Sequence, residues 1–314
     1  MFDIPILFIV FNRPDTTFRV FEAIRAIQPK CLYIAADGPR LHVEGDAEKC
    51  RKVRSLIEKI DWDCDVKTFF RETNYGSFAP YTFIKWFFEH EEMGVVLEDD
   101  CLPDNDFFLF CREMLLRYKD DERIGIVSGS NFDLKEMTPF SYYFSKNTFI
   151  WGWASWRRVV QPFDASLDSL PFNEFKALLK KDFDTLGERL QFKNVYRGLK
   201  RGEIKTWDYQ FSFSLLKRGL LSVIPGKNLI SNIGFSVDAI HTTDTSSPLA
   251  SRRREAIFPL KHAPDVERNR EAERQFFRNH VMEHRPCKFY LKMLLKRIGV
   301  FQYLMALKKG GSYR

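Results

Sequence analysis

The stretch GVVLEDDCLPDNDFF (Gly94–Phe108) runs an apolar segment directly into three consecutive carboxylates. Adjacent like charges repel each other, and burying them without partners is costly. Glu98, Asp99 and Asp100 therefore either spread into water at a strand end, with Asp104 capping the next helix, or surround a positive charge. Acidic triplets are common on protein surfaces, so these residues alone do not decide between the two interpretations.

Further apolar segments with polar ends lie on both sides of this stretch, and helical patterns separate them. Strands are predicted over Pro5–Phe11, Cys31–Ala36, Asp65–Phe70, Met93–Leu97 and Arg123–Gly129. Helices are predicted over Thr16–Ile27, Glu44–Ile60 and Tyr81–His90. This alternation is typical of an α/β fold with a mostly parallel sheet flanked by helices. Ligands of such sheets bind at the carboxyl ends of the strands, where this chain carries NRPD, DGPR and EDD.

The second half of the chain is less regular. Ser141–Val160 is rich in aromatic residues and has no clear period, and no repeat or linker divides the chain. Helices are predicted over Pro171–Lys200 and Trp207–Gly219, a strand over Leu220–Gly226, and a turn-rich loop over Asn232–Pro248.

The composition is that of an ordinary soluble globular protein, with 45% hydrophobic and 29% charged residues. The 31 phenylalanines predict a core and a cleft rich in aromatic rings. Pro5–Phe11 is too short for a signal peptide or a membrane span. The six cysteines form no CxxC pair, which favours reduced thiols and a cytoplasmic location.

The net charge of +7 is concentrated near the carboxyl terminus. Residues 251–314 hold 16 Lys or Arg against 6 Asp or Glu, so the rest of the chain is mildly acidic. This distribution argues against a nucleic-acid-binding core. The segment from Arg285 onward mixes lysines with large apolar residues. Two interpretations stay open: a helix lying on the inner face of the cytoplasmic membrane, or a helix packing its apolar side on the domain.

Several motifs, in this order, resemble those of the GT-A glycosyltransferases, in particular the N-acetylglucosaminyltransferase I-like group and related bacterial enzymes. They are PILFIVFNRP, IAADGPR, NYGSFAPYTFI, VVLEDDCLPDNDFF, FIWGWASWRR, TWDYQFSFSL and NIGFSVDAIHT. The resemblance implies a Rossmann-like GT-A catalytic domain over residues 1–250, with a nucleotide-binding half over about 1–130 and a sugar-binding half over about 131–250. Residues 251–314 would form a basic helical extension.

By this resemblance the acidic triplet is the family's DxD motif. Asp100 would coordinate a divalent metal, Mn²⁺ or Mg²⁺, while Glu98 and Asp99 would contact the ribose or position the sugar. Hard cations of this kind take oxygen ligands and are commonly bridged to phosphate. The metal would then supply the positive charge that the three acids require.

The resemblance also assigns a nucleotide pocket. Phe11, Asn12 and Arg13 would line it, Asp37 would hydrogen-bond a uracil ring, and Asn74 would lie in a turn beside it. Arg13 and Arg71 are candidates for the diphosphate or the base, because guanidinium groups suit phosphate. Each assignment has a plainer alternative: Asp37 also suits a turn before Gly38, and the arginines also suit surface ion pairs.

On the acceptor side the resemblance assigns Asp208 as the base that takes the proton of the acceptor hydroxyl, with Glu203 in reserve. The alternative for Asp208 is the N-cap of the following helix. Trp153 would shape the donor-sugar pocket, although some tryptophans of FIWGWASW also suit a core. His241 would reach the metal or the diphosphate, and the alternative is an exposed loop residue.

These assignments together predict a metal-dependent glycosyltransferase. It would move a sugar from a nucleotide-diphosphate donor, UDP favoured, to a saccharide or lipid-linked saccharide hydroxyl with inversion. A nucleotidylyltransferase is the first alternative, but it needs a glycine-rich loop after the first strand, and FNRPD has no glycine. The second alternative is a non-catalytic carbohydrate- or membrane-binding protein.

Overall fold

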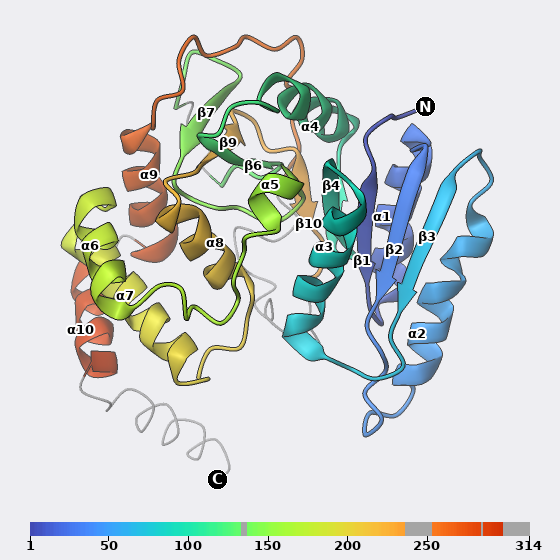
Figure 1. The fold of residues 1–314 in the computed structure, drawn as a ribbon, viewed down its shortest axis with the longest axis horizontal. Helices are drawn as coiled ribbons and strands as arrows, with labels where there is room; N and C mark the ends of the chain where they lie inside the picture. The colour runs from blue at the N-terminus through green and yellow to red at the C-terminus, as the bar shows by residue number, and fades with distance from the viewer. Residues whose placement is uncertain (133–136, 236–252, 284, 298–314) are drawn as a thin grey trace.

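The computed structural model describes residues 1–132, 137–235, 253–283 and 285–297. Within them, eight strands form one sheet in the order β3-β2-β1-β4-β8-β6-β9-β7 (Figure 1). The strands are β1 Ile6–Val10, β2 Cys31–Ala36, β3 Asp65–Phe70, β4 Met93–Glu98, β6 Ile124–Ser128, β7 Tyr142–Ser145, β8 Trp153–Trp156 and β9 Leu221–Pro225. All run parallel except β7 and β8. The predicted α/β fold with a mostly parallel sheet is confirmed.

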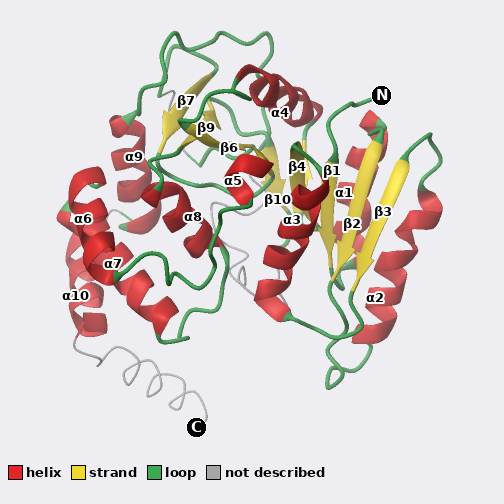
Figure 2. Cartoon of the chain, in the orientation of Figure 1, coloured by secondary structure: helices red, strands yellow, loops and turns green. Residues whose placement is uncertain are grey.

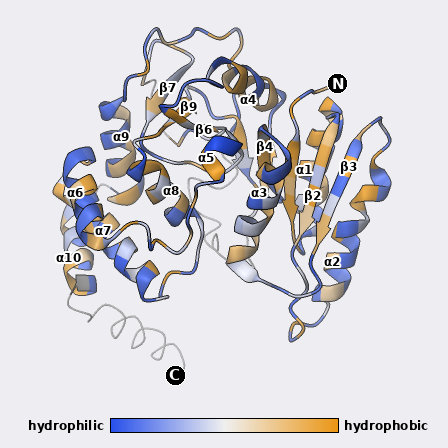
Figure 3. Cartoon of the chain, viewed as in Figure 1, coloured by the Kyte–Doolittle hydropathy of each residue, from blue (hydrophilic) through white to orange (hydrophobic). Residues whose placement is uncertain are grey.

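The strand order creates a switch point between β1 and β4. From β1 the chain passes to β2 and β3 on one side, and then returns to place β4 on the other side of β1. Every residue of β1 is buried, because helices cover both faces of this part of the sheet. Figure 3 shows the hydrophobic residues along β1 and β2. Such a switch point leaves a crevice beyond the carboxyl ends of the two strands.

Helices cover both faces of the sheet (Figure 2). They include α1 Pro14–Ile27, α2 Asp46–Arg54, α3 Ala79–His90, α4 Asn105–Arg117, α5 Arg157–Val160 and α8 Asp208–Lys217. Short 3₁₀ turns, Ser55–Lys59 and Gly76–Phe78, follow α2 and precede α3. The two tryptophans of β8 point to opposite faces: the ring of Trp153 lies 5.3 Å from that of Phe211 in α8, whereas Trp156 donates to a carbonyl of α4. As predicted in one of the two interpretations, Asp104 caps α4, accepting from the Asp106 backbone N–H.

The sequence did not predict four short strands. Besides β7 and β8, these are β5 Cys101–Pro103 and β10 Ile230–Asn232, which pair antiparallel with each other. Both β7 and β8 are four residues long and buried throughout, so they show no alternation of polar and apolar residues. Neither their length nor their pattern distinguishes them from a buried loop.

The predicted helix over Pro171–Lys200 is two helices, α6 Phe172–Asp182 and α7 Leu186–Lys200. The break falls at Thr185, which forms a capping box with Glu188 at the start of α7. The T-x-x-E signal for this break is present in the sequence, at Thr185–Glu188. Together with α8, these helices enclose a second hydrophobic core.

The carboxyl-terminal region packs on the domain through α9 Arg270–Phe276, a π-helical turn Phe277–Val281 and α10 Pro286–Arg297. A buried ion-pair network attaches it: the Lys146 ammonium lies 3.1 Å from Glu188 of α7 and 3.6 Å from Glu273 of α9. All six cysteines are unpaired. In the described part of the chain, every helix is too short or too polar to cross a bilayer.

Candidate functional site

A cavity of about 1190 Å³ opens at the switch point of the sheet. Its walls come from the carboxyl ends of β1, β2 and β4, the start of α1, the segment 203–209 before and within α8, and residues 232–234 at the end of β10 and just after it. Most of the residues that the sequence assigned to a site lie on these walls: Phe11, Asn12, Arg13, Asp37, Asn74, Glu98, Asp99, Asp100 and Asp208.

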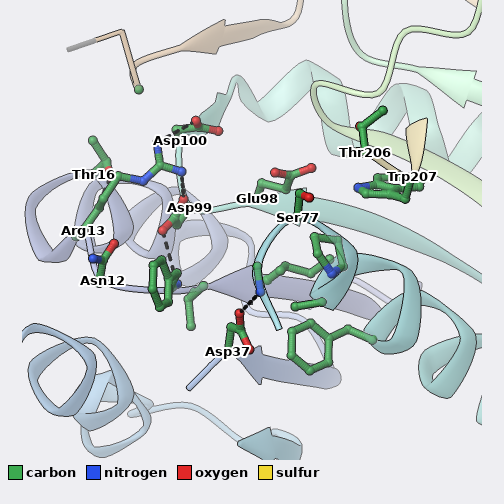
Figure 4. Close-up of a pocket in the computed structure, with 18 of the residues that line it drawn as sticks. Asn12, Arg13, Thr16, Asp37, Ser77, Glu98, Asp99, Asp100, Thr206 and Trp207 are labelled. Carbon is green, nitrogen blue, oxygen red and sulfur yellow. Dashed lines mark hydrogen bonds and ion pairs between the residues drawn. The ribbon is translucent and has the colours of Figure 1, made fainter. Parts of the chain in front are cut away.

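Arg13 supplies the positive charge that the acidic triplet requires. Its guanidinium is paired with Asp99 and lies 2.9 Å from Asp100 Oδ2 (Figure 4). The backbone N–H of Phe11 also donates to Asp99, at 3.3 Å. Asp99 and Asp100 are both buried, so the interpretation of a solvated strand end is wrong for them. An arginine of the chain thus provides one positive partner for these acids, and the predicted metal at Asp100 stays a prediction.

One arginine does not neutralise three acids. Burial raises the pKa of Glu98 well above its usual range, and the charges of Asp100 and Asp99 raise it further. Burial likewise raises the pKa of Asp99, against the lowering effect of Arg13. The side chain of Glu98 extends from this group toward Thr206 and Trp207 on the other side of the cavity (Figure 4). The site thus holds more negative charge than its own cation offsets.

The whole cavity has the same imbalance. Its described lining contains seven carboxylates and four cationic side chains. The carboxylates are Asp15, Asp37, Glu98, Asp99, Asp100, Glu203 and Asp208, and the cations are Arg13, Arg40, Lys49 and Lys205. A phosphorylated ligand entering this cavity would need additional positive charge.

Gly234 packs directly against the Arg13–Asp100 ion pair. A Cβ at this position would lie 2.3 Å from Asp100 Oδ2 and 2.7 Å from Arg13 Nη1. The backbone there is fixed by a hydrogen bond from the Gly234 N–H to the Asn232 side chain, at 2.9 Å. Only glycine leaves room for the ion pair, so the segment after β10 is part of the site.

Asp37 holds the turn between β3 and α3. Its carboxylate accepts from the backbone N–H groups of Tyr75 and Gly76 and from the Asn74 amide, at 2.8–3.0 Å. Burial raises its pKa, although these backbone hydrogen bonds lower it. The turn interpretation of Asp37 therefore describes its contacts in this structure, and its predicted hydrogen bond to a uracil ring stays a prediction.

A second ion pair, Arg40–Asp46, which was not predicted from the sequence, stabilises the loop after β2. The Arg40 side chain and its backbone N–H both bind Asp46, at 2.8 Å each, and the Asn12 amide donates to the same carboxylate. The Arg40 guanidinium also lies over the ring of Phe11, 5.3 Å from its centre. Burial would raise the pKa of Asp46, but the hydrogen bonds from Arg40 and Asn12 lower it to about 2. The loop is thereby tied to the end of β1.

Asp208 lies across the cavity from the acidic triplet. Its Oδ1 accepts from the Thr206 hydroxyl and, at 2.7 Å, from the Tyr209 backbone N–H. Its charge also contributes to the raised pKa of Glu98, after burial and the two aspartates. Asp208 is not the N-cap: α8 begins at Asp208 itself, and the cap position is Trp207. The carboxylate is half-buried and faces the cavity with a fixed orientation.

Two assignments need correction and one lies outside the described residues. Trp153 is only 1% exposed and packs in the core against Trp207 and Phe211, whereas Trp151, two residues earlier, lines the cavity. Arg71 is not part of the lining: it stacks on the Tyr75 ring and donates to Thr82 at 2.9 Å. His241 lies outside the described residues.

The oxygen atoms available at this site are of the type that a hard divalent cation binds. Carboxylate oxygens are the preferred ligands of Mg²⁺ and Mn²⁺, and the surplus negative charge around Glu98 and Asp100 favours a cation there. Among the described residues, no group of three or more His, Cys, Asp or Glu side chains is arranged to hold a metal. A cation at this site would therefore need ligand oxygens, such as those of a diphosphate, to complete its coordination.

No family model matches the sequence, and no curated protein matches it. Solved structures that resemble the fold include S. aureus TarS, with and without UDP, at 10% identity and a TM-score of 0.39. That likeness covers 73% of this chain and 59% of TarS, so this chain spans less than two thirds of the solved TarS. Mouse xyloside xylosyltransferase 1 is 10% identical, with a TM-score of 0.34 over 69% of this chain and 83% of the other.

Nucleotidylyl-transferring enzymes resemble the fold to a similar degree. The 4-diphosphocytidyl-2C-methyl-D-erythritol synthase of Anaerococcus prevotii is 9% identical, with a TM-score of 0.34 over 70% of this chain and 87% of the other. A xylosyltransferase, a glycosyltransferase and a cytidylyltransferase are thus all among the solved structures that the fold resembles. At these identities and scores the likeness concerns the fold and does not determine what this chain does.

Proposed function

We propose that the protein is a metal-dependent glycosyltransferase that uses a nucleoside-diphosphate sugar, with uridine as the favoured base. One observation carries the proposal: carboxylates from two separate elements, the end of β4 and the start of α8, face one cavity at the switch point of the sheet. A binding module has no need of a rigidly held carboxylate opposite an acidic, arginine-containing strand end. A transferase needs both.

The donor would occupy the cavity with its base toward β2 and its diphosphate at β4. Phe11, with Arg40 over its ring, offers an apolar and cationic wall for a flat base. Arg13 would bind diphosphate oxygens, because its forked guanidinium suits phosphate and is already held at the cavity wall. When bound, a divalent cation held by Asp100 would supply positive charge at the departing diphosphate.

Asp208 would act as the general base. It would take the proton of the acceptor hydroxyl as that oxygen forms a bond to the anomeric carbon and the bond from this carbon to the diphosphate oxygen breaks. The hydrogen bonds from Thr206 and Tyr209 occupy Oδ1 and fix the carboxylate, so it needs no reorientation during the reaction. Attack from the face opposite the leaving diphosphate would invert the anomeric centre.

Turnover of nucleotide sugars in the Asp208→Asn variant tests the proposal. We expect thermal stabilisation by UDP with Mn²⁺ to persist, and release of UDP from a UDP-sugar to fall at least about a hundredfold. Glu203→Gln tests the reserve candidate in parallel, and we expect it to keep most of the UDP release, because Glu203 lines the same cavity but is exposed and paired with Arg201, at 2.8 Å. Undiminished UDP release in Asp208→Asn would remove Asp208 as the base. Release of pyrophosphate from a nucleoside triphosphate and a sugar 1-phosphate would instead identify a nucleotidylyltransferase.

A further inference from the structure

Helix α10 is apolar on two sides. Phe289 and Met293, one turn apart, are buried, and the ring of Phe289 lies 5.6 Å from that of Phe277 in the π-helical turn. This inner side attaches the helix to the domain, as the second interpretation of the basic tail predicted. It does not account for the large apolar residues on the other side of the helix.

The outer side carries Tyr290, Leu291 and Leu294, which are 40%, 57% and 53% exposed. Leu186, at the start of the neighbouring helix α7, is 59% exposed. The two helices are in contact there, since a Cβ on Gly187 would lie 3.2 Å from the Tyr290 hydroxyl. These four residues, Leu186, Tyr290, Leu291 and Leu294, are called the α7/α10 patch below.

A row of lysines runs along the edge of this patch. Lys288, Lys292 and Lys296 are spaced four residues apart and therefore lie on one side of α10, next to the exposed apolar residues. The helix contains no acidic residue between Pro286 and Arg297. By contrast, the exposed leucines of α4, Leu109 and Leu116, share their helix with acids as well as arginines. An exposed apolar surface on a helix that carries lysines and no acid matches an anionic bilayer.

We propose that the α7/α10 patch docks the protein on an anionic lipid bilayer, with the apolar side chains among the headgroups and the lysine row against lipid phosphates. A second copy of the chain is a poorer occupant. A two-fold contact through the patch would bring two lysine rows together, and like charges across an interface oppose association.

The docking does not depend on the proposed function and is testable without substrate.

The test is co-sedimentation of the full chain with vesicles of phosphatidylcholine, alone or in equimolar mixture with phosphatidylglycerol. We expect binding to the mixed vesicles that weakens with added salt, and little binding to phosphatidylcholine alone. The double variant Leu291→Glu, Leu294→Glu should lower the partition coefficient about tenfold or more, because it removes apolar contact and adds repulsion. Its fold should persist, since both side chains are exposed.

The matched control is Leu109→Glu, Leu116→Glu on α4, where the side chains are 49% and 42% exposed. This variant should bind the mixed vesicles as the wild type does. Equal binding by the α10 variant, or binding that is indifferent to phosphatidylglycerol, would overturn the proposal. A dimer in light scattering that the α10 substitutions dissociate would also overturn it, because the patch would then be an interface between copies.

Discussion

Replacing Arg13 with Gln would remove the only cation that contacts the acidic end of β4 in the described structure. Arg13 makes charge-assisted hydrogen bonds to Asp99 and Asp100, whose side chains are 4% and 12% exposed. Glutamine keeps the aliphatic stem and an amide donor but is shorter and carries no charge. Two buried carboxylates, with Glu98 beside them, would then lack a compensating charge.

Removing one partner of a buried ion pair typically destabilises a protein by about 3–5 kcal/mol. The Arg13 side chain is 34% exposed, so water screens part of its interaction with Asp99 and Asp100. We therefore expect a loss in the free energy of unfolding of about 3 kcal/mol at pH 8, near the lower end of that range.

The loss should depend on pH in a defined direction. Burial raises the folded-state pKa of Asp99, and Arg13 lowers it, so the variant would have a still higher value. When the pKa of a carboxyl group is higher in the folded than in the unfolded protein, the free energy of unfolding falls as pH rises between the two pKa values. The variant should therefore approach the wild type near pH 5 and fall behind it progressively toward pH 8.

Urea unfolding at several pH values, followed by circular dichroism, measures this difference. Arg25→Gln is the matched control. The Arg25 Nε lies 3.0 Å from Asp61 Oδ1, but both side chains are exposed, so we expect little change in the free energy of unfolding at any pH. Added Mn²⁺ should recover part of the Arg13→Gln loss if the carboxylates can hold a cation. A loss below about 1 kcal/mol, or one that does not vary with pH, would refute the account of the acidic cluster.

Three further predictions concern the cavity wall. Asp46→Asn should lower the free energy of unfolding by about 2 kcal/mol at neutral pH. The difference from the wild type should vanish as pH falls from about 4 to about 2, because the Asp46 carboxylate stabilises the fold only while it is ionised. Urea unfolding at each pH measures this difference. Gly234→Ala should weaken UDP binding in calorimetry while the far-ultraviolet spectrum is unchanged, since its Cβ would displace the Arg13–Asp100 pair. Trp151→Ala should raise KM for the sugar donor or acceptor about tenfold, with little change in Tm. Trp153→Ala should instead lower Tm, because the loss of its buried ring leaves a cavity in the core. Kinetics and thermal melts distinguish the two variants.

Much of the fold of residues 1–130 was predictable from sequence because its strands are bounded by strong local signals. The ends of β2 and β3 agree with the predicted ranges to the residue, since turn residues flank both apolar segments. The strands β7 and β8 were not predictable in this way, because four fully buried residues carry no period. Their place in the sheet depends on partners distant in sequence.

The site was predictable as a set of polar strand ends but not as a set of contacts. The sequence predicted that a positive charge lies near Asp100, but not that Arg13 provides it. Arg13 and Asp100 meet only because β1 and β4 pair in the sheet. Trp151 lines the cavity where Trp153 was predicted to, and this difference has a local cause. Gly152 adopts φ +64° where a Cβ would lie 2.6 Å from Ile230, and this turn leaves one ring at the cavity and the other in the core.

The Arg13–Asp100 pair has a consequence for how two ligands would affect each other. A free divalent cation that approaches Asp100 must compete with the guanidinium of Arg13, which lies at the start of α1 just after the neighbouring strand β1. A diphosphate offers that guanidinium an alternative partner, and so frees Asp100 for the cation. Nucleotide and metal should therefore each increase the affinity for the other by the same factor, because such coupling is thermodynamically reciprocal.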